Sequence, residues 1–220
     1  MLANVYLHAV LDEWFEKEVK PRLNGKAIEV RYADDAALFF EYREDAERVL
    51  EILPKRFAKF GLVLHPGKTR LIEFGRQAYW KARRAGTRPA TFDFLGFTYL
   101  ATLSRRGKFT VHVKTMKKRL GRSLNAISEW CQTHRHDDVQ SQWKSLTAKM
   151  RGHYEYYGRA TNFRCLQQFY RAVRRLWRKW LNRRTRGKTL TWKDYQQLLA
   201  HFPLLCPRIT RPWAGAVSQA

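Results

Sequence analysis

The chain has 220 residues, enough for one large domain or two small ones, and a hydrophobic fraction of 45% argues against a disordered basic tail. Its 43 Lys and Arg outnumber its 19 Asp and Glu, giving a formal net charge of +24. This excess favours a polyanionic partner, with nucleic acid first, over a basic surface that serves only solubility. No long apolar span or signal peptide is present, so no membrane partner is expected. The three cysteines are widely spaced with no CxxC pair, which fits a reducing cytoplasm and predicts neither a zinc ribbon nor a disulfide framework.

The chain is predicted to open with a helix followed by a hairpin. Apolar residues recur at helical spacing over residues 2–14, and Pro21 with Asn24-Gly25 ends this helix. Residues 28–40 then alternate between apolar and polar positions around Asp34-Asp35. This pattern predicts two short strands joined by a tight turn at or beside the two aspartates.

A second helix is predicted over residues 46–60. Gly61 is suited to end it, because glycine adopts the left-handed conformation of a helix C-terminus. Pro54 lies within the pattern and is expected to kink or split the helix. Two short strands are predicted beyond it, at residues 62–64 and 71–74.

A polar and basic stretch comes next, and it is followed by a second hairpin. Residues 77–90 contain Gly86 and Pro89 and are expected to form a loop. Residues 92–100 alternate as one strand, which turns at Arg105-Arg106-Gly107 and returns through residues 109–113.

After Lys114 the pattern becomes purely helical, so we place a boundary there between a mixed part and a helical part. Helices are expected over residues 115–130, with Thr115 as the cap, over residues 139–157, and from about Asn162. A last helix begins at Thr191, with Asp194 at the spacing of a capping box. The polar residues 134–138 between two of these helices are expected to form a solvated loop rather than a metal site.

Basic residues concentrate in the helical part. Between Arg151 and Lys188 there are ten Arg and two Lys against a single acid, Glu155. Aromatic residues interleave with them, so one helix face is expected to pack the core while the arginines bind phosphates. Some of the aromatic residues could instead stack on bases, and that alternative stays open.

The aspartate pair has two interpretations. Aspartate tolerates turn geometry, so Asp34 and Asp35 are explained by a solvated turn alone. They are equally suited to Mg²⁺, which takes hard oxygen ligands and commonly uses one or two carboxylates together with substrate phosphates. A strand-turn-strand is a rigid platform for such carboxylates in a site where two metal ions transfer a nucleotide.

Several motifs, in order, resemble those of one family. Tyr32-Ala33-Asp34-Asp35 between apolar strands resembles the reverse transcriptase signature. The segment before it, Met1-Leu2-Ala3-Asn4-Val5-Tyr6-Leu7, resembles its counterpart in reverse transcriptases encoded by bacterial group II introns. So does the block Gly61-Leu62-Val63-Leu64-His65-Pro66-Gly67-Lys68-Thr69. The segment Phe92-Asp93-Phe94-Leu95-Gly96-Phe97 resembles their primer grip. The stretch from Arg151 to Gly158, with the Arg- and Trp-rich helix after it, resembles their thumb, called maturase domain X.

The resemblance implies an α+β fold. Residues 1–113 would be a partial reverse transcriptase palm, an antiparallel sheet with helices, and residues 114–220 an all-α thumb or maturase domain. It implies an RNA-directed DNA polymerase that also binds its own intron RNA and assists splicing. The expected partners are group II intron RNA, an RNA template with a DNA primer, and deoxynucleoside triphosphates, with Mg²⁺ as the cofactor.

The resemblance also assigns roles to residues. Asp34 and Asp35 would be catalytic carboxylates that bind Mg²⁺, with Tyr32 and Ala33 near the incoming nucleotide. Lys68 would lie close to the active site, although an ordinary turn lysine explains it too. Primer positioning would fall to Phe94, Leu95 and Gly96, which could also be strand core. The RNA or template-primer surface would be lined by Arg151, Arg159, Arg164, Arg171, Arg174, Arg175, Arg178, Arg183 and Arg184.

The chain departs from the family pattern ahead of Met1, where the fingers and a first palm segment with a further catalytic aspartate would stand. We therefore expect a chain that is truncated at its N-terminus and polymerises poorly alone. Asp12 and Glu13 are expected to be solvated rather than to replace that aspartate. No Cys/His nuclease module follows Pro212-Trp213. The alternative is an RNA-binding maturase remnant that assists intron splicing without catalysis.

Overall fold

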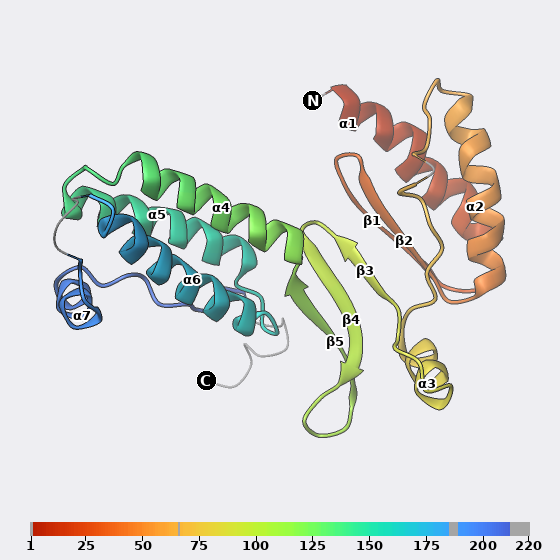
Figure 1. The fold of residues 1–220 in the computed structure, drawn as a ribbon. Helices are drawn as coiled ribbons and strands as arrows, with labels where there is room; N and C mark the ends of the chain where they lie inside the picture. Colours follow the sequence, from red (N-terminus) through yellow and green to blue (C-terminus); the bar gives the residue numbers. More distant parts are fainter. Residues whose placement is uncertain (1, 66, 185–188, 212–220) are drawn as a thin grey trace, which may run out of the picture. The chain divides into compact units, whose positions relative to one another are not determined.

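The computed structural model describes residues 2–65, 67–184 and 189–211, and within them it has the predicted α+β fold (Figure 1). Met1, Pro66, Arg186, Lys188 and Pro212-Trp213, which were part of the sequence arguments, lie outside the described residues. The chain divides into two compact units. We call Met1–Leu95 with Leu100–Thr110 the hairpin unit, and Gly96–Tyr99 with Val111–Ala220 the helical unit.

The predicted opening helix is confirmed, although it is not uniform. It begins as α1 (Leu2–Leu7) and continues through two wider π-helical segments, His8–Asp12 and Phe15–Val19, to a 3₁₀ turn at Lys20–Arg22. Its buried face is apolar and packs with the strands and helix that follow. The core of the hairpin unit contains Val10, Leu11, Trp14, Phe15, Val19, Ala27, Val49, Leu53 and Phe57.

The first hairpin is also confirmed. Strand β1 (Ala27–Tyr32) pairs antiparallel with β2 (Asp35–Phe40), and Tyr32 lies opposite Asp35, so the turn consists of two residues. One face of this hairpin packs into the core through Ala27, Leu38 and Phe40. The other face is largely uncovered, and Ile28 and Tyr32 on it are 61% and 69% exposed.

Helix α2 (Arg43–Ala58) runs without a break through Pro54, so the predicted split is wrong. Its C-terminus is closed as expected. Gly61 has φ +66°, Leu62 donates its N–H to the carbonyl of Phe57 at 3.0 Å, and Gly61 donates to Ala58 at 3.1 Å. This bonding pattern is a Schellman motif, which satisfies carbonyls that the helix leaves unpaired.

The two short strands predicted at residues 62–64 and 71–74 are wrong, because both segments lack regular structure. The alternation that suggested a strand is real, since Leu62 and Leu64 pack onto the core while Val63 is 92% exposed. No neighbouring strand pairs with this segment in the described part of the chain, so the alternation reflects burial alone.

The loop predicted over residues 77–90 contains a helix, α3 (Arg76–Arg84), and the prediction is wrong there. Tyr79 is the buried residue of this helix, and its ring meets that of Phe109 edge to face at 6.0 Å. Its four cations, together with Gln77 and the exposed Trp80, hid a helical pattern whose apolar side consists of Tyr79 and two alanines.

The second hairpin region has three strands instead of two. Strands β3 (Thr91–Phe94), β4 (Phe97–Leu103) and β5 (Phe109–Thr115) pair in that order. The single strand predicted over residues 92–100 is therefore divided by a turn at Leu95-Gly96. Both turn residues have positive φ, +48° and +77°, which is characteristic of the type I′ turn of tight hairpins.

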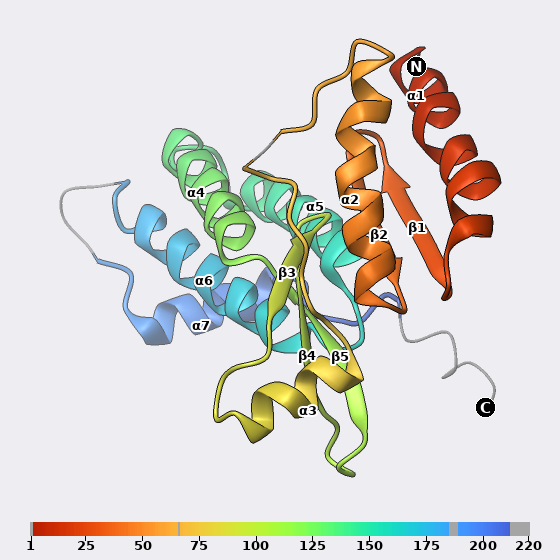
Figure 2. The ribbon, with the colours of Figure 1, turned by 90° about the vertical axis from the view of Figure 1, so that its right-hand side faces the viewer.

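The helical unit is built on α4 (Lys117–Thr133), α5 (Val139–Tyr157) and α6 (Phe163–Leu181), which lie side by side, with α7 (Trp192–His201) against them (Figures 1 and 2). Its core includes the fully buried Leu146, Met150, Leu166 and Trp177. The one polar atom of the Trp177 ring is satisfied, because its Nε1 donates to Gln142 Oε1 at 2.9 Å.

The helix starts were predicted with mixed success. Asp138 caps α5 by accepting from the Ser141 amide, and Thr191 with Asp194 forms the predicted capping box. Thr115 is not a cap, because it ends β5 and its hydroxyl accepts from Asn162 Nδ2 at 2.8 Å. That hydroxyl is thereby used in a tertiary contact, and α4 begins two residues later without a side-chain cap.

Residues 134–138 form a turn, as expected, and this turn is ordered by Gln142. The Gln142 amide nitrogen donates to the carbonyls of His134, Arg135 and Asp137 at 2.8, 3.3 and 3.1 Å. Within the described residues, no helix combines the length and the apolar character that a membrane span requires.

The helical unit is predicted to lose stability in acid through His153. This side chain is 9% exposed and stacks on Phe169 at 3.7 Å, and burial lowers its pKa from 6.5 to about 4. The unfolded chain therefore takes up a proton at higher pH than the folded chain. This contribution is complete above pH 6.5 and is lost as the pH falls to about 4, by on the order of 3 kcal/mol.

Denaturant unfolding of the wild type and of His153→Gln at neutral and acidic pH measures this contribution. The carboxylates titrate in both proteins, so the comparison isolates His153. We expect the stability gap between the two proteins to narrow as the pH falls. A constant gap would contradict the assignment.

Candidate functional site

The aspartate pair lies at the turn of the first hairpin. Asp35 begins β2, and Asp34 occupies the turn with Ala33, whose φ of +55° is in the left-handed region. Both aspartates are exposed, and neither carboxylate forms a hydrogen bond or ion pair with a residue in the described part of the chain. The turn thus presents two adjacent carboxylates, held on paired strands and open to an external ligand.

Arg31 connects this turn to the opening helix. Its Nε and Nη2 donate to the two carboxylate oxygens of Asp12, each at 2.6 Å, and its Nη1 donates to the carbonyl of Ala33 at 2.8 Å. The Arg31 side chain is 14% exposed and that of Asp12 is 24% exposed. The prediction that Asp12 is solvated is therefore wrong. A bidentate pair of this kind fixes geometry as well as adding energy, and here it holds the strained turn residue.

A second carboxyl group lies beside this ion pair. Glu29, two residues before Arg31 on the same face of β1, shares a hydrogen bond with Asp12. Burial and the charge of Asp12 raise the pKa of Glu29 to about 7, while the Arg31 hydrogen bond lowers that of Asp12 to about 2. The protonated form of Glu29 is therefore favoured below about pH 7, where it can donate to the Asp12 carboxylate.

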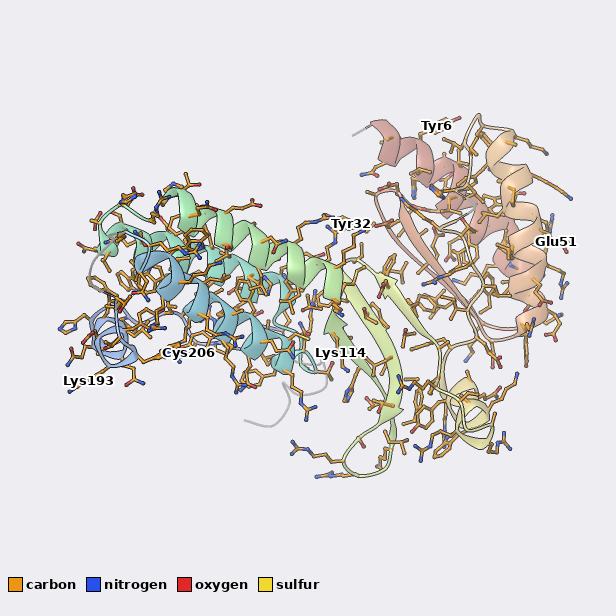
Figure 3. All side chains as sticks on the ribbon, in the orientation of Figure 1. Tyr6, Tyr32, Glu51, Lys114, Lys193 and Cys206 are labelled. Atoms are coloured by element: carbon orange, nitrogen blue, oxygen red, sulfur yellow. The ribbon has the colours of Figure 1, made fainter. Side chains whose placement is uncertain are left out.

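The other residues assigned to nucleotide binding lie at or away from this turn. Tyr32 and Ala33 adjoin Asp34 on the hairpin, and Tyr32 is 69% exposed (Figure 3). Lys68 is exposed on a different loop, where its amide donates to the carbonyl of His65 at 3.0 Å. Its ammonium group has no hydrogen bond or ion pair among the described residues, so the structure leaves it available without placing it beside the aspartates.

The primer-grip residues differ in their surroundings. Phe94 ends β3, and this strand contacts the aspartate hairpin through Phe92, whose ring meets that of Phe39 on β2 at 6.2 Å. Leu95 and Gly96 form the tight turn rather than strand core. Gly96 packs closely within the helical unit, since a Cβ there would lie 3.3 Å from the Tyr157 hydroxyl.

The nine arginines assigned to RNA binding fall into two groups. The first is exposed, with no ion pair among the described residues: Arg151, Arg164, Arg171, Arg175 and Arg183. The second packs on neighbouring groups: Arg159 over Phe97, Arg174 over Tyr170, Arg178 over Trp192, and Arg184 onto the carbonyl of Asp137. Arg183 is exposed but also lies over Trp180, at 5.0 Å.

Three of the exposed arginines form a stripe along α6. Arg164, Arg171 and Arg175 are spaced by seven and four residues, so they fall within about 40° of one another around the helix. The buried residues Leu166, Phe169 and Val173 lie on the opposite side. The core therefore fixes this basic face toward solvent.

The site offers a pair of carboxylates on a protein that is otherwise strongly basic. The described residues include no cluster of three His, Cys, Asp or Glu side chains arranged around a metal ion. Asp34 and Asp35 supply hard oxygen ligands of the kind that Mg²⁺ uses together with substrate phosphates, so their chemistry fits this ion.

The comparison with protein families bears on the hairpin unit. Residues 1–99 match the family described as reverse transcriptase (RNA-dependent DNA polymerase). The matched segment of the chain includes Asp34 and Asp35, Lys68, and the turn at Leu95-Gly96. A search of curated proteins found no match. The match covers less than half of the 220 residues, and it agrees with the resemblance carried by Tyr32-Ala33-Asp34-Asp35.

Sequence reasoning missed the residues that hold the turn at Ala33-Asp34. Arg31 and Glu29 occupy alternate positions of β1, and the exposed face of that strand carries Ile28, Val30 and Tyr32. A hydrophobic pattern predicts that the apolar face of a strand is buried, so it predicted that Glu29 and Arg31 face solvent. The available signal was Asp12, an acid directly after the buried Val10 and Leu11 of the opening helix.

We expect Glu29→Gln to stabilise the hairpin unit at alkaline pH. The folded pKa of about 7 exceeds the ordinary 4.5, so folding favours the protonated group. Its stabilisation is present below pH 4.5 and is lost as the pH rises through 7. An amide at this position keeps a donor toward Asp12 and carries no charge. The variant should gain about 2 kcal/mol over the wild type between pH 5 and pH 8, after allowance for partial exposure. Unfolding curves at both pH values measure this gain, and an equal difference at the two would contradict it.

We expect a double-mutant cycle on Asp12→Asn and Arg31→Gln to show strong coupling. Each single change leaves a partly buried charge without its partner, so each should cost about 2 kcal/mol, with a coupling energy of about 1–3 kcal/mol. Denaturant unfolding measures it. The exposed pair Lys17–Glu13 is the matched control and should couple by less than about 0.5 kcal/mol. Comparable coupling in the two pairs would show that Arg31 does not clamp the turn.

Proposed function

We propose that the chain is an RNA-directed DNA polymerase and maturase of a group II intron, with residues 1–113 as palm and 114–220 as thumb or maturase domain, acting in the cytoplasm. The observation that supports it most is the turn at Ala33-Asp34. The reverse transcriptase match covers this turn, and its two carboxylates are exposed, adjacent and without partners in the described chain.

Asp34 and Asp35 are the proposed Mg²⁺ ligands and catalytic carboxylates. When bound, Mg²⁺ stabilises the charge on the phosphate oxygens of a nucleoside triphosphate. The protein residues orient the reactants. Arg31 fixes the carbonyl of Ala33 and with it the direction of the two carboxylates, while Tyr32 and Ala33 border the incoming nucleotide.

The remaining residues of the polymerase are assigned to charge and primer position. Lys68, whose exposed ammonium group has no ion pair among the described residues, neutralises charge on nucleotide or template. Phe94, Leu95 and Gly96 position the primer strand. A tight turn suits this role, because its two residues present backbone to a ligand while the strands on either side hold them in place.

Group II intron RNA is the proposed partner of the helical unit. The stripe Arg164, Arg171 and Arg175 extends about 16 Å along α6 and faces away from the core. Arg151 and Arg183 add exposed charge on α5 and after α6. Such a surface binds phosphates with an affinity that falls steeply with salt.

The alternative is an RNA-binding maturase that assists splicing without polymerising. The arginine stripe supports it, because this surface is formed within the helical unit and needs neither aspartate. The two functions therefore make different demands on the same chain, and one pair of substitutions separates them.

We expect Asp34→Ala with Asp35→Ala to lower Mg²⁺-dependent primer extension on an RNA template at least about a hundredfold, since each lost metal ligand removes stabilisation worth several kcal/mol. Binding to structured RNA should persist, with its salt dependence unchanged. The control is Glu44→Ala with Glu51→Ala, which removes two exposed carboxylates from α2. Extension that survives the aspartate change would reject polymerisation through this pair. RNA binding that also falls in the double variant would contradict the maturase alternative, which requires neither aspartate.

A further inference from the structure

Helix α3 carries a surface that the proposed roles leave unused. Residues 70–110 contain nine Arg and Lys against two acids, Glu73 and Asp93. In the hairpin unit, α3 lies beside the turn between β4 and β5, and its Tyr79 ring packs on Phe109 of β5 (Figures 1 and 2). Nitrogen-tipped side chains point outward from both segments (Figure 3).

The helix separates its apolar and basic sides completely. At 3.6 residues per turn, Arg76, Trp80, Arg83 and Arg84 fall within an arc of about 100°. The other side consists of Tyr79, which is buried, with Ala78 and Ala82. The packing of Tyr79 thus fixes the direction of the basic face, and this face points to solvent.

The cations of this face lack partners in the part of the chain that the structure describes. Lys81 is neutralised by Glu73, since its Nζ lies 3.1 Å from both carboxylate oxygens. Arg76, Arg83 and Arg84 form no ion pair among the described residues. Cations near a helix C-terminus interact favourably with the helix dipole, which explains Arg83 and Arg84. Arg76 lies at the first position of the helix, where its interaction with the dipole is unfavourable.

Trp80 gives this face a second feature. It is 40% exposed although it is among the most apolar side chains, and it lies between the arginines. Its ring meets that of Tyr79 edge to face at 5.2 Å, which leaves ring surface open to solvent. Together with Arg76, Gln77 and Arg84 it lines a shallow hollow of about 600 Å³, with the Lys81–Glu73 pair also on its border. A helix dipole does not account for an exposed indole at this place.

We propose that α3 binds single-stranded nucleic acid, with Arg76, Arg83 and Arg84 on successive phosphates and the Trp80 ring stacked on an unpaired base. Arginine beside an open aromatic face is the combination that such strands require, because their phosphates are anionic and their bases expose π surfaces. A duplex offers the phosphates but keeps its bases stacked, so it uses the arginines without Trp80. The proposal requires neither aspartate and stands independently of polymerisation.

The test is the affinity of the full chain for labelled oligonucleotides, measured by fluorescence anisotropy across a salt series without nucleotide or Mg²⁺. The probes are an unstructured oligouridylate, an oligothymidylate and a blunt RNA duplex. We expect Trp80→Ala to weaken binding of both single strands about tenfold and to leave duplex affinity within about twofold. Trp80→Phe keeps an aromatic ring and should restore most of the affinity.

The charges are tested by Arg76→Gln with Arg83→Gln and Arg84→Gln. Three lost phosphate contacts should reduce the slope of log affinity against log salt by about 2 for single strands. The matched control is Lys17→Gln with Lys20→Gln and Arg43→Gln, which removes the same charge from cations already paired with Glu13, Glu16 and Glu47. It should change the slope by less than half as much.

Trp192→Ala controls for the aromatic change. Trp192 is 49% exposed, but the Arg178 guanidinium already covers its ring at 4.2 Å, so it should not affect the preference for single strands. Thermal unfolding confirms that each variant is folded. The proposal is overturned if Trp80→Ala leaves single-strand affinity unchanged, if it weakens duplex binding equally, or if the two triple variants have the same salt slope.

Discussion

One guanidinium group holds the site of the hairpin unit together. Arg31 binds both oxygens of Asp12 and the carbonyl of Ala33, so it joins the opening helix to a turn whose backbone is strained. A two-stranded hairpin is marginal on its own and needs packing against a helix. The apolar contacts of Ala27, Leu38 and Phe40 supply that packing, and Arg31 extends it to the end where the aspartates lie. The positions of Asp34 and Asp35 therefore depend on residues that do not touch a ligand.

In the helical unit a neutral side chain, that of Asn162, joins neighbouring elements as Arg31 does in the hairpin unit. Asn162 is fully buried, and its amide accepts from the Thr115 amide at 2.8 Å and donates to the Thr115 hydroxyl and the Tyr157 carbonyl, also at 2.8 Å. It thereby ties the end of β5 to the end of α5 and the start of α6. A buried amide with all these partners costs little, whereas a charge there would need compensation. The charge of this unit is instead displayed on the outer side of α6.

Prediction from sequence succeeded where one signal dominated. The bounds of α5 followed from a regular apolar pattern, and α7 followed from its capping box. The first hairpin and its turn followed from apolar alternation around the aspartates. For the two helices local chemistry and tertiary packing favour the same structure, so local rules suffice, whereas for the hairpin they predict the strands and the turn but not which face is buried.

Prediction failed where tertiary contacts decided. The turn at Leu95-Gly96 requires positive φ at a leucine, which no local rule favours. Thr115 has the chemistry of a cap, but Asn162 engages its hydroxyl. In α3 a single buried tyrosine replaces the usual apolar stripe. For the site, the aspartates were found from their motif, whereas Arg31 and Glu29 were not, because their strand turns its charged face inward.

Asp34 and Asp35 lie side by side without partners among the described residues, whereas other acids of the hairpin unit are engaged inside it. Asp12 and Glu29 belong to a network inside the hairpin unit, where Arg31 neutralises Asp12 and burial favours the protonated form of Glu29. Asp34 and Asp35 take no part in that network, although the chain has 43 Lys and Arg from which a partner could have come. Because these two carboxylates have no cation partner among the described residues, they are able to bind a cation from solvent. The acids inside the hairpin unit are thus separate from Asp34 and Asp35 at its turn. A ligand-binding turn requires this separation.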